Sequence, residues 1–168
     1  LTKPGPKMRA LMREVEKPDH DGKLDYLHAV SALIRERIVY RAGTTGVTTS
    51  AEDAAAAETG VCQDHTHIFI GAARAADIPE RYVSGYLMMN DRVEQDATHA
   101  WAEAHIDGLG WVGFDISNGI SPDPRYVRVA TGCDYRDAAP VTGISFGSIE
   151  QVLSVDVKVE QQREQDIQ

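Results

Sequence analysis

Apolar side chains recur at helical spacing in two stretches of the first half of the chain. The first stretch, over residues 22–40, has its aliphatic positions at Leu24, Leu27, Val30, Leu33, Ile34 and Ile38. This spacing predicts an amphipathic helix with Asp21 as a candidate N-cap. A second helix is predicted over residues 61–76, because Thr59-Gly60 precedes it and Pro79 follows it. Between the two we expect a loop over residues 41–49 and a short alanine-rich helix that begins at Ser50.

Beyond residue 80 the pattern changes to alternation of apolar and polar positions, which is typical of β-strands. We predict strands over residues 81–89, 97–106, 111–116, 126–130 and 152–159. The sequence Asp-Gly-Leu-Gly at residues 107–110 is a hairpin signal between two of these strands. Helices followed by an antiparallel sheet predict an α+β fold.

The two ends of the chain lack a strong pattern. Residues 1–21 contain three prolines and scattered charge, so we expect a linker or tether there, with a turn or two of helix. Residues 22–160 are predicted to form the folded domain. Residues 161–168 are almost wholly polar and are predicted to be a tail.

Composition narrows the class of protein. A length of 168 residues suits one domain, and 17 basic against 26 acidic residues give a net charge of 17 − 26 = −9. This charge argues against nucleic acid or an anionic membrane as a partner. No apolar run approaches the roughly 20 residues that span a bilayer, and no signal peptide is evident, so we expect a cytoplasmic protein. The chain begins at Leu1, so we also expect that an upstream signal or domain could have been removed.

Cys62 is a candidate nucleophile. The two cysteines, Cys62 and Cys133, are too few for a disulfide scaffold or a four-cysteine zinc site. Cys62 falls in the first turn of the predicted second helix, where unpaired backbone amides and the helix dipole favour the ionised thiol. Gly60 permits a sharp turn that lets the sulfur face a cleft. The alternative is a buried, inert cysteine.

His99 and Asp115 are candidates for a base and an orienting acid. Strand alternation places His99 on one face with Trp101, Glu103 and His105, and alanines on the other. If the alanine face packs on the helix of Cys62, His99 points away from the thiol unless the strand bulges or both faces are buried. The hairpin brings Asp115 roughly level with the stretch from His99 to Glu103, where a carboxylate can fix the tautomer of a histidine. A structural histidine and a solvated carboxylate are the alternatives.

Supporting roles are predicted for side chains near this set. Gln63 or Tyr82 could donate a hydrogen bond to an oxyanion, and Trp101 could form a wall of the cleft. Cys62, His65 and a strand histidine could bind zinc, but His67 lies on another side of the helix. No calcium-binding loop is evident. We therefore predict no metal and no other cofactor.

Three blocks of sequence together resemble the transglutaminase-like superfamily, and most of all its bacterial cysteine-protease branch. The blocks are the segment around Cys62, the sequence His-Ala-Trp at residues 99–101, and Gly-Phe-Asp-Ile-Ser-Asn at residues 113–118. Residues 132–137 and 139–143 resemble a further stretch that is common in that branch. The resemblance runs from about residue 24 to residue 147. It implies a papain-like core in which the nucleophile's helix packs on an antiparallel sheet.

The resemblance also implies roles for particular residues. Cys62 would be the nucleophile, His99 the general base and acid, and Asp115 the orienting acid. Cys133 stands where the family pattern has an arginine, so any role of that arginine is weakened here. Relatives often carry an additional β-rich domain ahead of the core, so such an N-terminal domain is expected in the full-length protein.

The function implied is thiol-dependent acyl transfer on amide bonds of a peptide or protein substrate through a thioester. The bacterial resemblance favours hydrolysis, as in a cysteine protease or amidase, over transfer to an amine. The alternatives are a non-catalytic module that binds a peptide or partner, and a zinc-dependent hydrolase. Residues 60–120 hold 3 basic and 9 acidic residues, a net of 3 − 9 = −6. This local charge predicts a preference for neutral or cationic substrates, weakened by salt.

Overall fold

The structure is a computed structural model that describes residues 1–19, 21–88, 94–95, 98–142 and 157–159. The helices in these residues are α1 Pro6–Met12, α2 Lys23–Arg37, α3 Ala51–Ala57 and α4 Cys62–Ala75. The strands are β1 Val39–Tyr40, β2 Thr59–Gly60, β3 Glu80–Leu87, β4 Glu94–Gln95, β5 His99–Ile106, β6 Gly110–Phe114, β7 Tyr126–Gly132 and β8 Val157–Lys158. The α+β prediction is confirmed.

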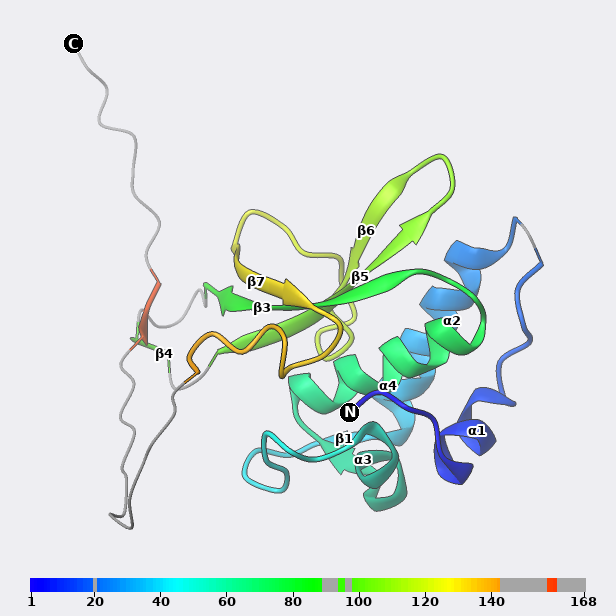
Figure 1. Cartoon of the computed structure of the whole chain (residues 1–168), viewed down its shortest axis with the longest axis horizontal. Coiled ribbons are helices and arrows are strands. Elements are labelled where there is room, and N and C mark those ends of the chain that lie inside the picture. The colour runs from blue at the N-terminus through cyan, green and yellow to red at the C-terminus, as the bar shows by residue number, and fades with distance from the viewer. Residues whose placement is uncertain (20, 89–93, 96–97, 143–156, 160–168) are drawn as a thin grey trace.

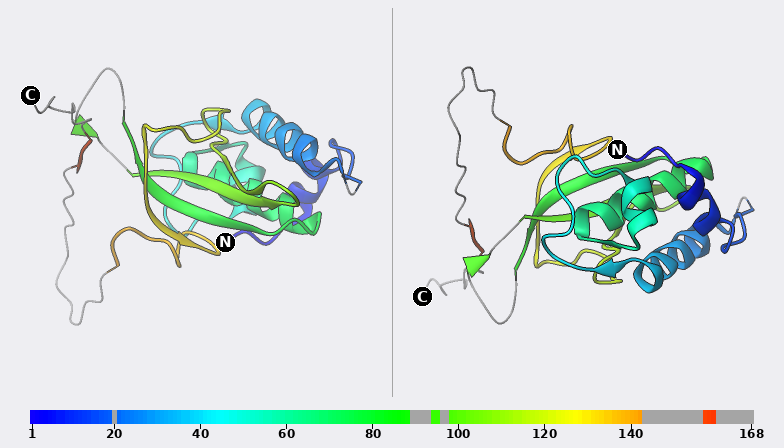
Figure 2. Two further views of the ribbon diagram at one scale, coloured as in Figure 1. Left: turned by 90° about the horizontal axis from the view of Figure 1, so that it is seen from above. Right: turned by 90° about the horizontal axis from the view of Figure 1, so that it is seen from below.

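The larger sheet has the strand order β6-β5-β3-β7 and is antiparallel throughout. Helix α4 packs against β3 and β5 and also contacts α1, α2 and α3 (Figure 1). Seen from above, the strands lie in front of α4, and seen from below α4 lies in front of the strands (Figure 2). The molecule therefore has a sheet layer and a helix layer, with α4 at their contact.

Small side chains on β5 let α4 approach the sheet. Ala100, Ala102 and Ala104 face the hydrophobic core, where they meet the fully buried Ile68 and Phe69 of α4. Burial of an apolar side chain of that size contributes about 1.5–3 kcal/mol to stability. The predicted packing of the alanine face against the helix of Cys62 is present.

The β5–β6 hairpin has the turn that the sequence predicted. Ile106 pairs with Gly110 and Ala102 with Phe114. Gly108 and Gly110 both have positive φ, which suits glycine. The second strand was expected to reach residue 116, but β6 ends at Phe114. Asp115 then leaves the ladder and forms an isolated bridge with Ile120.

The first residues of the chain differ from the linker that we expected. Helix α1 has its first residue at Pro6, a position where the missing N–H costs little. Met8 is completely buried, and its backbone N–H and that of Lys7 donate to the Glu52 carboxylate at 3.0 and 2.8 Å. The Leu1 ammonium forms an ion pair with the Asp134 carboxylate at 3.2 Å. Residues 1–12 are thus a packed part of the fold, whereas the domain boundaries at residues 22 and 160 stay predictions.

Two short parallel strands were not foreseen. The first helix was predicted to reach residue 40, but α2 ends at Arg37 and the next residues form β1. In β1, Val39 pairs with Thr59 and Tyr40 with Gly60 of β2. This pairing fixes the chain immediately ahead of Cys62.

Of the strand predicted over residues 152–159, only the part from residue 157 is described, and it contains β8, which pairs with β4. The predicted tail over residues 161–168 lies outside the described residues, and no described helix is long and apolar enough to cross a membrane.

Candidate active site

Cys62 is the first residue of α4, and its side chain is almost wholly buried. Asp64 secures this helix start, since its Oδ2 accepts hydrogen bonds from the Val61 N–H at 2.8 Å and the Thr45 hydroxyl at 2.6 Å. A Cβ at Gly60 would lie 2.6 Å from the Cβ of Asp64. The φ angle of Gly60 is not positive, so its backbone conformation does not call for glycine. The close packing against Asp64 does, because a side chain would not fit there. The predicted position of the thiol at a helix N-terminus is present.

His99 and Asp115 are joined directly. The Nε2 atom of His99 lies 2.6 Å from Oδ2 of Asp115, whose side chain is completely buried. The same Oδ2 accepts hydrogen bonds from the Tyr126 hydroxyl and from Nδ2 of Asn118, each at 2.6 Å. Oδ1 accepts from the Asn118 backbone N–H at 3.1 Å. The carboxylate is thus held by donors from β5, from its own turn and from β7.

These contacts shift the protonation of both groups. Burial alone lowers the pKa of His99, but its hydrogen bond to Asp115, its interaction with Cys62 and the charges of both groups outweigh it and raise the pKa to about 10. Burial alone raises the pKa of Asp115, but hydrogen bonds from His99, Tyr126 and Asn118 lower it overall. The geometry therefore favours an imidazolium next to a carboxylate.

The His99 ring also lies close enough to the Cys62 side chain for that group to raise the pKa of the imidazole. Because Nε2 faces Asp115, Nδ1 is the ring nitrogen left for the thiol. The sequence left open how His99 could reach Cys62 from the face opposite the alanines. Both faces of β5 are buried, with Trp101 at 2% and Glu103 at 4% exposure. His99 stands at the first position of β5, which places its ring at the end of the strand rather than over the middle of the sheet.

Of the three side chains with predicted supporting roles, Trp101 contacts His99, whereas Tyr82 and Gln63 have other neighbours. The Trp101 ring is stacked at 6.4 Å from the His99 ring and is buried, so it forms a wall beside it. Tyr82 is buried with its ring 5.1 Å from that of His67, and burial, followed by the charge of Cys62, raises the pKa of its phenol. The Gln63 amide instead donates to the Gly46 carbonyl at 3.4 Å.

Sequence reasoning missed two residues that contact Asp115. Asn118 lay inside the block that carries the family resemblance, and its spacing of three from Asp115 is that of a side chain that can cap a turn. Tyr126 gave no such signal, because its contact depends on how β7 pairs with β3. The Tyr126 ring also packs 5.9 Å from His99 and 5.4 Å from Trp101.

Both ring nitrogens of His65, which we considered as a possible zinc ligand, are hydrogen-bonded to other protein groups. Its Nε2 donates to the Ile38 carbonyl at 3.1 Å, and its Nδ1 accepts from the Ser117 hydroxyl at 3.0 Å. Burial lowers its pKa, which favours this neutral form. Among the described residues, no group of three or more His, Cys, Asp or Glu side chains could hold a metal ion. Cys133 is exposed, and its carbonyl accepts from Arg74 at 2.8 Å.

Residues 9–116 match the family model described as the Transglutaminase-like superfamily. The chain is 36% identical over 136 residues to the uncharacterized protein ML0607 of Mycobacterium leprae, which covers 78% of this chain and 48% of the relative. It is 33% identical over 168 residues to the uncharacterized protein Rv2569c of Mycobacterium tuberculosis, covering 92% of this chain and 53% of the relative. The chain thus spans about half the length of these relatives.

Two solved structures have a similar fold. The structure named "Putative Cysteine Protease from Cytophaga hutchinsonii" superposes with a TM-score of 0.66 at 33% identity, covering 79% of this chain and 43% of that one. LapG of Legionella pneumophila superposes with a TM-score of 0.57 at 13% identity, covering 74% and 71%. At 13% identity the likeness shows the fold alone. Together they confirm the predicted helix-on-sheet core.

Proposed function

Because the chain belongs to the transglutaminase-like superfamily, a superfamily of thiol-dependent enzymes, we propose that it catalyses acyl transfer on amide bonds. Cys62 is the nucleophile, His99 the general base and acid, and Asp115 the orienting carboxylate. The observation that carries this proposal is the 2.6 Å contact between Nε2 of His99 and Oδ2 of the buried Asp115, with the Cys62 side chain close enough to the same imidazole to raise its pKa.

The arrangement supports a two-step reaction. The Cys62 thiolate attacks the carbonyl carbon of an amide, and the carbonyl oxygen becomes an oxyanion. Backbone N–H groups in the first turn of a helix have no intrahelical partner, so that of Cys62 is available to the oxyanion. His99 gives its proton to the departing amine, which leaves a thioester. His99 then takes a proton from water, which attacks the thioester, releases the acid and restores the thiolate–imidazolium pair.

We propose hydrolysis of a peptide or protein substrate, as by a cysteine protease or amidase. The support is the 33% identity to the Cytophaga hutchinsonii structure, whose name states a putative cysteine protease. A primary amine in place of water would give a crosslink or a transamidated product by the same thioester. A cytoplasmic location and an additional N-terminal β-rich domain stay predictions from the sequence.

Selective alkylation tests the nucleophile. Iodoacetamide at a pH near 6 should label Cys62 faster than the exposed Cys133, because thiols at a helix N-terminus next to a histidine are more reactive than exposed thiols without such neighbours. His99→Asn should slow the labelling of Cys62 and leave that of Cys133 unchanged. Slow labelling of Cys62 that is insensitive to His99→Asn would count against a catalytic thiol.

Product analysis tests the reaction. Mass spectrometry of a glutamine-containing peptide library, incubated with and without a primary amine, separates hydrolysis from transfer. Cys133→Ala should keep the activity and Cys62→Ala should abolish it. Absence of turnover, with Cys62→Ala indistinguishable from the parent chain, would favour a binding module. Turnover that Cys62→Ala retains but a chelator removes would favour a zinc hydrolase.

A further inference from the structure

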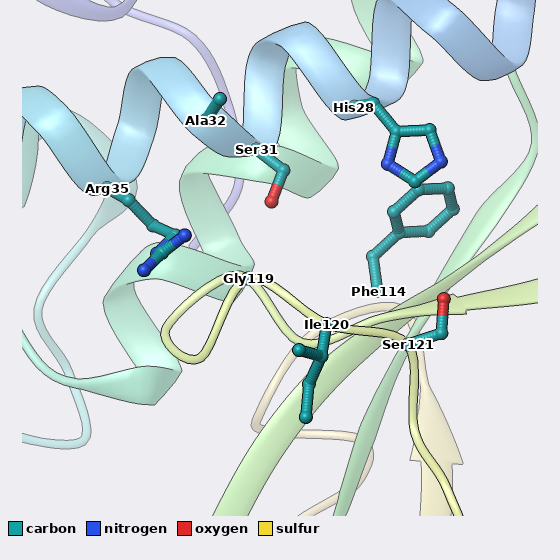
Figure 3. A pocket seen from close by; sticks show the side chains of 8 residues that line it. All are labelled: His28, Ser31, Ala32, Arg35, Phe114, Gly119, Ile120 and Ser121. Atoms are coloured by element: carbon teal, nitrogen blue, oxygen red, sulfur yellow. The ribbon is translucent and has the colours of Figure 1, made fainter.

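A cavity of about 160 Å³ lies between α2 and the turn that follows Asp115 (Figure 3). One wall is a single face of α2, and the opposite wall is formed by Phe114 and residues 119–121. The α2 wall consists of His28, Ser31, Ala32 and Arg35. The Gly119 N–H donates to the Asp115 carbonyl at 2.8 Å, so the cavity lies directly behind the turn that carries Asp115. Cys62 and His99 do not line it, which separates it from the proposed active site.

The polar side chains around this cavity are donors that lack a protein partner among the described residues. Ser31 is only 7% exposed, yet its hydroxyl makes no hydrogen bond to a described residue and points into the cavity (Figure 3). Arg35 forms no ion pair with any carboxylate in the described part of the chain. Its guanidinium is held over Gly119, where an added Cβ would lie 2.1 Å from Nη1. Arg35 and His28 are exposed, so a ligand that enters the cavity from solvent can reach these donors and the Ser31 hydroxyl.

The lining selects an acidic ligand. No carboxylate lines the cavity, although the chain as a whole carries a charge of −9. Arg35 offers a planar fork of N–H donors suited to a carboxylate. Phe114, Ala32 and Ile120 supply apolar contact between the two polar ends. A ligand with a carboxylate next to a short aliphatic chain would match Arg35 and the apolar side chains beside it.

The second polar end sets the length of the ligand. His28 lies seven residues before Arg35 on α2, about 10 Å along the helix axis. Its imidazole offers an N–H in either tautomer, and the Ser121 hydroxyl lies on the opposite wall of the cavity (Figure 3). A cavity of about 150 Å³ is known to hold a six-carbon ring, so this volume accepts a short chain but not a large metabolite.

We propose that this cavity binds a short dicarboxylic acid, with one carboxylate held by Arg35 and Ser31 and the other by His28 and Ser121. The site does not depend on the proposed catalytic function, and its test measures binding alone.

The test is a titration of the whole chain with succinate, acetate, butyrate and inorganic phosphate at constant ionic strength. The amide ¹H–¹⁵N signals of Gly119 and Ile120 report occupancy, and the melting temperature gives a second measure. Succinate should produce saturable shifts and bind at least about tenfold more tightly than acetate or butyrate.

Matched variants locate the site. Arg35→Gln and Ser31→Ala should each weaken succinate binding about tenfold or more. Ala32→Leu, which fills the cavity without changing charge, should abolish binding. Arg37→Gln is the control, because Arg37 lies on the same helix but pairs with Glu14 outside the cavity.

Some outcomes would overturn the proposal. These are shifts that never saturate, equal binding by Arg35→Gln and the parent chain, or unchanged binding by a folded Ser31→Ala variant. Phosphate binding tighter than that of succinate would also overturn it, since it would identify a site for a tetrahedral oxyanion.

Discussion

At the scale of single residues, the Asp115 carboxylate controls the proton on His99. The pKa of His99 is raised to about 10 from an ordinary value of 6.5, so the ring keeps its proton well above neutral pH. The stability that this pair contributes is fully present below the unfolded pKa and is lost as the pH rises through the folded one. We expect Asp115→Asn to lower the pKa of His99 by roughly one to three units. An NMR titration of the His99 ring measures it.

The control for that titration is Asp123→Asn. Asp123 is an exposed acid of the same loop region that bonds to Arg125 rather than to His99. Its removal should leave the His99 midpoint in place. An unchanged midpoint in Asp115→Asn would mean that another group, such as Cys62, is responsible for the raised pKa of His99.

Tyr126 acts on the same carboxylate through its hydroxyl. We expect Tyr126→Phe to raise the pKa of Asp115, because a donor to the ionised form is lost while the ring packing stays. A hydrogen bond to a charged group contributes about 1.5–3 kcal/mol, so kcat should fall about 10- to 100-fold. The acid limb of the pH–rate profile should move to higher pH.

Tyr86→Phe is the matched control, since Tyr86 lies on β3 opposite Val127 and makes no hydrogen bond to Asp115. It should behave like the parent chain. A loss of activity in Tyr126→Phe without movement of the acid limb would indicate a packing role instead.

These residues show which parts of the site a sequence can reveal. Cys62, His99 and Asp115 each stand in a distinctive local setting, and the structure brings all three together. The contact of Tyr126 arises only from strand order, because β7 reaches the site through its pairing with β3 rather than with a neighbour in sequence. Local pattern carries no record of such pairing.

At the scale of elements, α1 is held by burial rather than by helix propensity, since it is too short to be stable alone. We expect Met8→Ala to lower the free energy of unfolding by about 2–5 kcal/mol, because it leaves a cavity against α4, where Gly71 has no side chain to fill it. Urea unfolding measures this. Met12→Ala, at a half-buried position, should cost less, and equal costs would argue that α1 is a loose tether.

The same element shows why composition misled the prediction. Prolines at the start of the chain suggested a linker, but Pro6 occupies the first position of α1 and favours the helix. The α4 helix and the β5–β6 hairpin were predicted well, because long apolar periodicity and a Gly-containing turn are strong local signals. Strands β1 and β2 were missed, since two-residue pairings leave no periodicity to read.

At the scale of the whole molecule, the acidic charge is concentrated over residues 60–120. We expect peptides with lysine near the reactive amide to be turned over faster than matched peptides with glutamate. The difference should shrink between about 0.01 M and 0.1 M salt, as the screening length falls from about 30 Å to about 10 Å. Steady-state kcat/KM for the paired peptides measures it. Faster turnover of the acidic peptide at low salt would contradict this expectation.

The β5–β6 hairpin has a consequence for protein engineering. Its strands carry His99 at one end and lead to Asp115, whereas its turn projects at the opposite end with Leu109 exposed and open space around Gly108. Exposed turns of this kind tolerate insertions well. A peptide handle inserted after Gly108, with the 2.6 Å contact between Lys23 and Asp107 left intact, would let the protein be immobilised on a support with its thiol facing away from the surface.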